Sequence, residues 1–267
     1  MDLQLTGKRA IVTGGSRGIG KAIARTLAAE GVDVALVARG REALEASASE
    51  LAAASGRKVV AITADTGDND SVRAMAAAAA EALGGIDILV NSAAQPASQG
   101  PAPTWEQIDA TAHFWPDMNV KVMGYLRTAQ AVAPYMKAGG WGRIVNISGL
   151  NARTAGATVG SMRNVAVAAM TKNLADELGP HGINVVVIHP GVTRTEATEG
   201  VIARRAAAEG RTPEEVEESM HRLNSVQRLI TADDIAYVAT MVASPRSIAL
   251  NGDAIAAGGG IPKAIYY

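Results

Sequence analysis

The sequence predicts a single α/β domain with a Rossmann-type, doubly wound parallel sheet of about seven strands, flanked by helices on both faces. Three observations predict this fold. Short β-branched segments alternate with alanine-rich segments along the whole chain. The β-branched segments are apolar along nearly their full length, as strands covered on both faces must be. The 267 residues, 48% of them hydrophobic, suffice for one large core.

The expected elements follow in a regular order. The expected strands lie within residues 9–15, 32–38, 58–65, 86–93, 142–148, 183–190 and 250–260. The expected helices, with apolar positions three and four residues apart, include residues 21–30, 41–55, 69–83 and 164–178. Residues 193–228 are the one long departure from this alternation, within a single domain that spans residues 1–267. Ligands of such sheets bind beyond the carboxyl ends of the strands, so candidate site residues are sought there.

Composition narrows the classes of partner. The chain has 25 Lys and Arg against 26 Asp and Glu, a net charge of −1, so no long-range field favours nucleic acid or an anionic membrane. We expect a small-molecule partner. The absence of cysteine excludes disulfides, thiolate catalysis and cysteine-ligated metal, and no metal site is predicted. No signal-like leader or apolar run of about 20 residues is present, which favours a cytoplasmic protein without a membrane anchor.

The first expected strand runs into TGGSRGIG, residues 13–20, which opens the first helix. Glycines here permit positive φ angles and a close approach of the backbone to a pyrophosphate. The helix N-terminus adds free N–H groups and a partial positive charge. The position at the first strand–helix junction is the context that dinucleotide binding requires. The expected cofactor contacts are Gly14, Ser16, Arg17, Gly18, Ile19 and Gly20.

The end of the second expected strand indicates which dinucleotide binds. An acidic residue there would hold the ribose 2′-OH of NAD, whereas an arginine accommodates the 2′-phosphate of NADP. This strand ends VALVARGR, with Arg39 and Arg41 and no acidic residue. Arg17 in the glycine-rich turn adds positive charge on the same side. The pattern favours NADP(H) over NAD(H), with Arg39 as a cofactor-binding residue.

Further motifs follow in a characteristic order. They are Asp65 in TADTGD, NSAA at 91–94, Asn119 in MNVKVMG, GRIVNIS at 142–148, MTKNLADEL at 170–178, HPGVTRT at 189–195 and RLITADDIA at 228–236. Together with TGGSRGIG they cover essentially the whole chain. The chain thereby resembles the short-chain dehydrogenase/reductase family, as a divergent member. The resemblance is more specific for the fold than for the reaction.

The resemblance implies roles for individual residues. Asp65 is expected to meet the adenine ring, and Asn91 with Ala93 the adenosine ribose. The nicotinamide carboxamide is expected to meet Pro190, Gly191 and Thr193. Thr195 is expected to meet the pyrophosphate. The family also uses a helical asparagine that holds a water molecule in its proton relay. Asn119 is the expected counterpart of that asparagine.

The family pattern breaks at the proton relay. Members of the family use a Tyr whose phenol is made more acidic by a Lys four residues later, and a Ser that polarises the carbonyl. Alignment through MTKNLADEL places Gly160 and Asn164 at the Tyr and Lys positions. None of the five tyrosines has a lysine four residues on. The serine position falls nearer Gly149 than Ser148, and Ser148 serves only if the strand end is shifted.

Several replacements for the relay remain open. The candidate catalytic residues are Asn119, Ser148, Asn164 and Arg163. Asn119 and Asn164 could hold a water, whereas Arg163 points elsewhere around the helix, which favours a structural ion pair. His221, in the segment 193–228 that covers the substrate in the family, could act as an acid or base. A surface histidine is the simpler reading of His221.

Three functions compete on the sequence. The first is an NADP(H)-dependent oxidoreductase for a small carbonyl or alcohol, or an activated alkene, with an atypical proton relay. The second is a non-catalytic NADP(H)-binding subunit or regulator, and the third is a lyase or isomerase on the same scaffold. The sequence favours the first. The resemblance also implies a homo-oligomer, a dimer or a tetramer.

Overall fold

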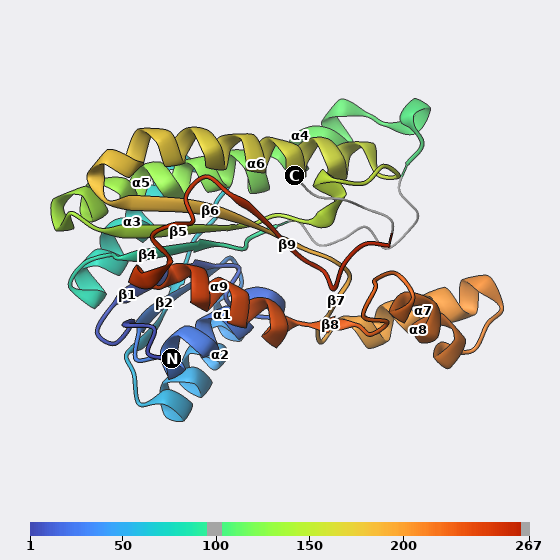
Figure 1. The fold of residues 1–267 in the computed structure, drawn as a ribbon, viewed down its shortest axis with the longest axis horizontal. Helices are drawn as coiled ribbons and strands as arrows, with labels where there is room; N and C mark the ends of the chain where they lie inside the picture. The colour runs from blue at the N-terminus through green and yellow to red at the C-terminus, as the bar shows by residue number, and fades with distance from the viewer. Residues whose placement is uncertain (95–102, 263–267) are drawn as a thin grey trace.

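The computed structural model describes residues 1–94 and 103–262, and within them the predicted fold class is confirmed. Seven strands of the described chain form one parallel sheet in the order β3-β2-β1-β4-β5-β6-β9 (Figure 1). Their bounds are β1 Arg9–Thr13, β2 Asp33–Ala38, β3 Val59–Thr63, β4 Ile88–Asn91, β5 Gly142–Ile147, β6 Ile183–Pro190 and β9 Ala254–Ala257. The direction of strand order reverses between β1 and β4, where a doubly wound sheet binds its ligand.

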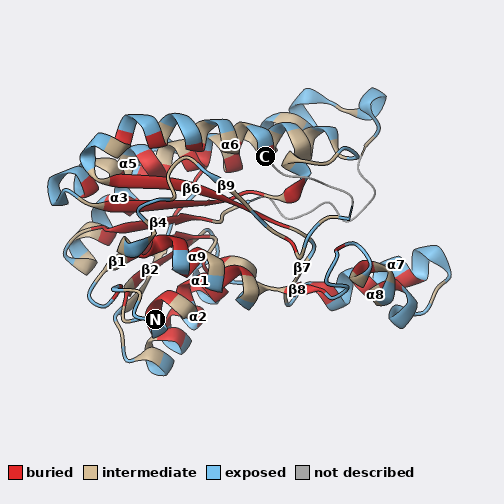
Figure 2. Cartoon of the chain, viewed as in Figure 1, coloured by how far each residue is buried: buried red, intermediate tan, exposed pale blue. Residues whose placement is uncertain are grey.

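Helices cover both faces of this sheet (Figure 1). The helices α1 (Gly18–Ala29), α2 (Arg41–Ser55) and α9 (Ala232–Ala243) pack on one face, and α3 (Asn69–Leu83), α5 (Gly124–Gly139) and α6 (Thr158–Leu178) pack on the other. Each face has its own apolar core, and the buried residues are concentrated in the strands and on the sheet-facing sides of the helices (Figure 2). The alternation of apolar strands and amphipathic helices in the sequence therefore corresponds to three layers.

A chain of buried polar side chains crosses the sheet where β4 and β5 end. Asn91 and Asn146 face each other in register, and the Nδ2 of Asn91 donates to Oδ1 of Asn146 at 3.0 Å. The hydroxyl of Thr128 on α5 donates to Asn91 Oδ1 at 2.7 Å. The Nδ2 of Asn146 donates to the hydroxyl of Thr171 on α6 at 2.9 Å. These four fully buried residues join α5, β4, β5 and α6 at the carboxyl edge of the sheet.

The approach to α5 is irregular. Residues Met118–Met123 form a wide, π-type turn between α4 (Trp115–Asp117) and α5. Gly124, the first residue of α5, packs closely on Thr66, because a Cβ there would lie 3.1 Å from the Thr66 carbonyl oxygen. Wide turns of this kind occur frequently at functional sites. The turn changes the direction in which the side chains of residues 118–123 point.

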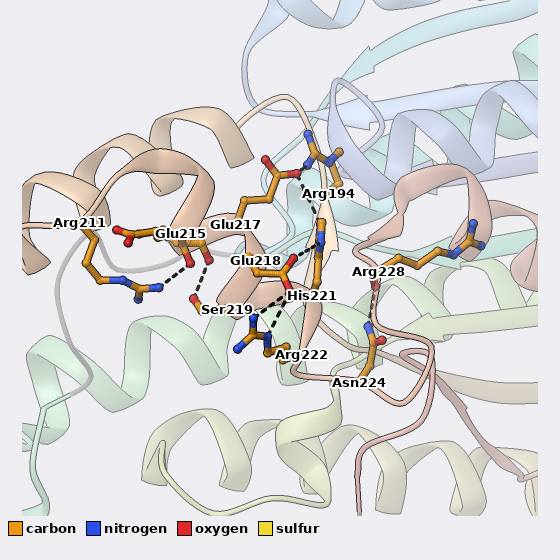
Figure 3. A network of polar contacts seen from close by, with 11 residues as sticks. Arg194, Arg211, Glu215, Glu217, Glu218, Ser219, His221, Arg222, Asn224 and Arg228 are labelled. Atoms are coloured by element: carbon orange, nitrogen blue, oxygen red, sulfur yellow. Dashed lines mark hydrogen bonds and ion pairs between the residues drawn. The ribbon is translucent and has the colours of Figure 1, made fainter.

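Residues 193–231, which include the predicted departure at 193–228, form a projecting arm. A short parallel pair, β7 (Thr193–Arg194) and β8 (Ile230–Thr231), stands at its two ends and encloses α7 (Thr198–Glu209) and α8 (Pro213–His221), which stand apart from the layered body (Figure 1). The arm has a small apolar cluster of its own, made of Ile202, Ala206, Val216, Met220 and Leu229. Ion pairs reinforce it, and Figure 3 shows Arg194 reaching Glu217.

No helix in the described part of the chain is both long enough and apolar enough to cross a bilayer.

Replacing Thr171 with valine should destabilise the fold, because it leaves the buried Nδ2 of Asn146 without its acceptor. We expect the free energy of unfolding to fall by about 1–3 kcal/mol in urea titrations. Thr63→Val, at the exposed end of β3, is the matched control and should change it by less than about 0.5 kcal/mol. Equal stability of the two variants would show that the polar chain does not fix the helices.

Candidate functional site

A cavity of about 730 Å³ lies at the carboxyl ends of the strands. It brings together most of the residues that the sequence assigned to the dinucleotide. They are Gly14, Ser16, Arg17, Gly18, Ile19, Gly20, Arg39, Asp65, Ala93 and Thr195. Asn91 does not line this cavity, since its side chain is committed to Asn146 and Thr128.

The glycine-rich turn has the shape that a pyrophosphate requires. Gly14 has a φ of +69°, and a Cβ on it would lie 2.9 Å from the carbonyl oxygen of Ser92. A Cβ on Gly20 would collide with the carbonyl of Gly14, so α1 packs directly on the turn. The hydroxyl of Thr13 accepts hydrogen bonds from the amides of Ser92 and Ala93, at 3.1 and 3.2 Å, which holds the segment after β4 against β1.

The N-terminus of α1 already attracts an anion. The amide of Gly18 donates to the carboxylate of Glu196, with its N 3.1 Å from Oε2. A carboxylate at this point indicates that the free N–H groups and the helix dipole favour negative charge there. The same donor is therefore suited to a phosphate oxygen, and the fit of this turn to a dinucleotide rests on this geometry.

Two arginines stand at the cavity wall near the end of β2. Arg39 directly follows the strand, and Arg17 extends from the glycine-rich turn. Neither forms an ion pair with another residue of the described chain, whereas Arg41 pairs with Glu45 at 3.4 Å. Two uncompensated guanidinium groups at this place suit a further phosphate.

A second cavity, of about 540 Å³, adjoins the first and shares Ile19, Ser148 and Thr195 with it. The expected nicotinamide-contacting residues Pro190, Gly191 and Thr193 line it. Leu223 and Asn224 reach it from the arm. The two cavities form one continuous site that meets at Ser148, the residue after β5.

Around Ser148, Gly149 and Asn164 fit one another sterically. The side chain of Asn164 is buried, with 3% exposure, and a Cβ on Gly149 would lie 2.9 Å from its Nδ2. Asn164 thus occupies space that Gly149 leaves open. The hydroxyl of Ser148 donates to the backbone carbonyl of Asn164 at 3.2 Å. A Cβ at Gly160 would make ordinary contacts with Asn151, at 3.4 Å, and with Ala157, at 3.5 Å, and Gly160 lines neither cavity.

The other sequence-derived candidates are placed as follows. Arg163 forms a bidentate ion pair with Asp117, at 2.7 and 2.6 Å, and still lines the second cavity. Asn119 points away from both cavities, because its Nδ2 donates to the Gly67 carbonyl and its Oδ1 accepts from Arg127. His221 lies on α8 between Glu217 and Glu218 and lines neither cavity (Figure 3).

Sequence reasoning missed Lys121. It lies two residues after Asn119 in the wide turn, has an exposure of only 5%, and lines the first cavity. Its Nζ donates to the carbonyl oxygen of Ser148 at 3.0 Å, and Ser148 lines both cavities whereas Lys121 lines the first. One signal was present in the sequence, since Lys121 stands between Val120 and Val122. A charged residue inside an apolar run is rarely buried, so its burial points to a specific role.

The surroundings of Lys121 disfavour its charge. Its pKa is lowered from 10.5 to about 7, first by burial and then by the nearby positive charge of Arg163, while Asp117 acts in the opposite direction. His189, at the end of β6, is kept neutral because burial first, and then Arg153 and Lys121, lower its pKa to about 4. Its Nδ1 has no hydrogen-bond partner among the described residues.

Comparison with known proteins identifies the family. A family model described as short chain dehydrogenase matches residues 8–206. The chain belongs to the short-chain dehydrogenase family. Members of it among the curated relatives include the short-chain reductase protein NovJ of Streptomyces niveus, 35% identical over 95% of this chain and 93% of the relative. The oxidoreductase UcpA of Escherichia coli is 35% identical over 98% of both chains.

Solved structures of short-chain dehydrogenases are also similar. L-sorbose reductase from Gluconobacter frateurii, complexed with NADPH and L-sorbose, has a TM-score of 0.91 at 27% identity and covers 99% of this chain and 100% of its own. A short chain dehydrogenase from Burkholderia cenocepacia in complex with NADP has a TM-score of 0.80 at 34% identity, over 96% and 98% of the two chains. The relatives support an oxidoreductase of the short-chain dehydrogenase type.

Replacing Lys121 with methionine should stabilise the protein in a pH-dependent way. The pKa of Lys121 is lower in the folded state, about 7, than in the unfolded chain. Below pH 7 the lysine is charged in both states, so its burial then lowers the free energy of unfolding by the full amount. The cost disappears as pH rises toward about 10.5. We expect a gain in the free energy of unfolding of roughly 3–5 kcal/mol at pH 6 that shrinks at pH 9.

Urea unfolding at several pH values measures this difference, with Lys172→Met as the control. Lys172 is exposed on α6 and pairs with Asp176, so its replacement should give a small, pH-independent difference. A Lys121→Met variant that is less stable than wild type at every pH would contradict a charge-disfavouring environment.

Proposed function

We propose that this short-chain dehydrogenase is an NADP(H)-dependent oxidoreductase that acts on a small carbonyl or alcohol, or an activated alkene, with an atypical proton relay. The observation that carries the proposal is the continuous site formed by the two cavities. One cavity has the dinucleotide-binding turn and two uncompensated arginines, and the other extends past Ser148 toward the arm. The similar structures complexed with NADPH and NADP support the same cofactor class.

The residues present fit this cofactor. The Gly18 amide would donate to the pyrophosphate after Glu196 moves aside, and Arg39 with Arg17 would hold the 2′-phosphate. Asp65 would bind the adenine, and Ala93 would border the ribose. When bound, the nicotinamide supplies or accepts a hydride. Pro190, Gly191, Thr193 and Thr195 would orient it at the junction of the cavities.

The substrate would occupy the second cavity. Asn164 and Ser148 supply polar groups on its wall. Leu223 and Asn224 border the cavity from the arm, which supports residues 193–228 as the segment that covers the substrate. Arg163, neutralised by Asp117, would shape the wall.

A homo-oligomer is part of the proposal. Met162 and Val165 on α6 have exposures of 51% and 50%. A second copy packed on this side of α6 would cover these two side chains.

The proposed reaction can be tested by a panel of ketones, aldehydes, activated alkenes and alcohols with NADPH or NADP⁺. We expect at least one substrate to change the absorbance of the reduced nicotinamide in proportion to product formed. Tight NADPH binding with no turnover across the panel would favour a non-catalytic binding subunit. Conversion of a substrate without any change in nicotinamide absorbance would favour a lyase or isomerase.

The proposed cofactor preference depends on Arg39. Replacing it with alanine should raise the Kd for NADPH by about 10- to 100-fold, because a charge-assisted contact with the 2′-phosphate is lost. The Kd for NADH, which lacks this phosphate, should change by less than about twofold. Fluorescence titration measures both, and Arg41→Ala, outside the cavity and paired with Glu45, serves as the control. An equal loss for both cofactors would contradict the assignment.

A further inference from the structure

We propose that Lys121 is the catalytic acid and base of this site, donating the proton to the substrate oxygen in reduction and accepting it in oxidation. This inference rests on the proposed oxidoreductase function and names the group that its proton relay uses. The residue comes from the turn before α5, whereas Gly160 and Asn164 belong to α6.

Few ionisable side chains line the two cavities. Among the described residues that line the two cavities, the ionisable ones are Arg17, Arg39, Asp65, Lys121 and Arg163. An arginine does not release its proton in proteins. Asp65 lies on the adenine side and accepts a hydrogen bond from the Gly67 amide at 2.8 Å. Serine and threonine hydroxyls are far weaker acids. Lys121 is the one described side chain on these walls that can exchange a proton near Ser148.

Lys121 also lies close to the place proposed for the substrate. The ammonium group of a lysine has three N–H donors, and the Ser148 carbonyl takes one of Lys121 at 3.0 Å. Lys121 lines the first cavity, and its partner Ser148 belongs to the walls of both, so the contact holds Nζ next to a residue that the second cavity shares. There the remaining donors can meet a substrate oxygen. Tyr125, one helical turn later, donates to the preceding carbonyl, that of Ile147, at 2.9 Å and anchors the same helix face.

The charges around Lys121 disfavour its ammonium form. Arg163 on α6 opposes its positive charge, and Asp117 on α4 partly compensates, the two being paired with each other at 2.6 Å. On the β6 side His189 is neutral at ordinary pH. Burial and Arg163 together bring the pKa of Lys121 to about 7. A proton donor is most effective when its pKa lies near the working pH.

The proton balance is simple. In reduction, the substrate carbon gains a hydride while its oxygen takes one proton from Nζ, so C=O becomes CH–OH. Lys121 is left as a neutral amine and takes a proton back from solvent. In oxidation the amine removes the hydroxyl proton as the carbon loses a hydride, and the ammonium then releases that proton to solvent.

The test compares wild type, Lys121→Met, Lys121→Arg and the control Lys172→Met in two measurements. The first is kcat against pH for reduction of a carbonyl that the panel selects. We expect kcat to fall about 10²- to 10⁴-fold in both Lys121 variants, because neither methionine nor arginine exchanges a proton. Wild-type kcat should fall as pH rises through the pKa of Lys121, and Lys172→Met should match wild type.

The second measurement needs no turnover. In protein with ¹³C at the lysine Cε, NMR titration should show one resonance that changes near pH 7 and is missing from Lys121→Met. A Lys121→Met variant with wild-type kcat, or a Lys121 resonance that changes only near pH 10, would overturn the proposal. Wild-type protein that turns over nothing would overturn the oxidoreductase function, and this role of Lys121 with it, even if the resonance changes near pH 7.

Discussion

The site depends on the buried polar chain that runs from Thr128 through Asn91 and Asn146 to Thr171. The two asparagine side chains are hydrogen-bonded to each other, and each is also hydrogen-bonded to a threonine hydroxyl of a helix. These bonds hold the ends of β4 and β5 and the helices α5 and α6 together. Buried polar groups are costly without partners, which makes this arrangement specific. Asn164 lies about two turns before Thr171 on α6, and the wide turn ends where α5 begins. The positions of both follow from this chain.

Burial of Lys121 lowers the stability of the fold, because its charged form is disfavoured there. One backbone carbonyl, that of Ser148, accepts a hydrogen bond from its ammonium. Arg163, which is paired with Asp117, lies nearby. The same features that reduce stability bring the pKa of Lys121 into the neutral range. On α6, Asn164 occupies the space that Gly149 leaves open, and Arg163 is paired with Asp117.

Local sequence patterns were sufficient for the fold, and most of the residues assigned to a dinucleotide line one cavity. Strand period, glycine spacing and strand-end residues are short-range properties, so Gly14 and Arg39 could be assigned directly. Asp65, Gly160 and Asn164 were assigned through the family motifs. The burial of Lys121 could not be predicted this way, because Lys121 and Asn119 lie two residues apart in a π-type turn and no local pattern says which of them faces the cavity. Its burial and pKa depend on Ser148 and Arg163, which lie far along the chain. The complementarity of Gly149 and Asn164 is likewise visible only in three dimensions.

The central claim is that the substrate oxygen meets the Lys121 ammonium where the two cavities join. The most direct test is a crystal structure of the protein with NADP⁺ and an unreactive analogue of a substrate found by turnover. We expect Nζ of Lys121 to lie within about 3.5 Å of the analogue's oxygen while it keeps its contact with the Ser148 carbonyl. An oxygen held only by Asn164 or Ser148, with Lys121 shielded from it by the cofactor or by protein, would contradict the claim.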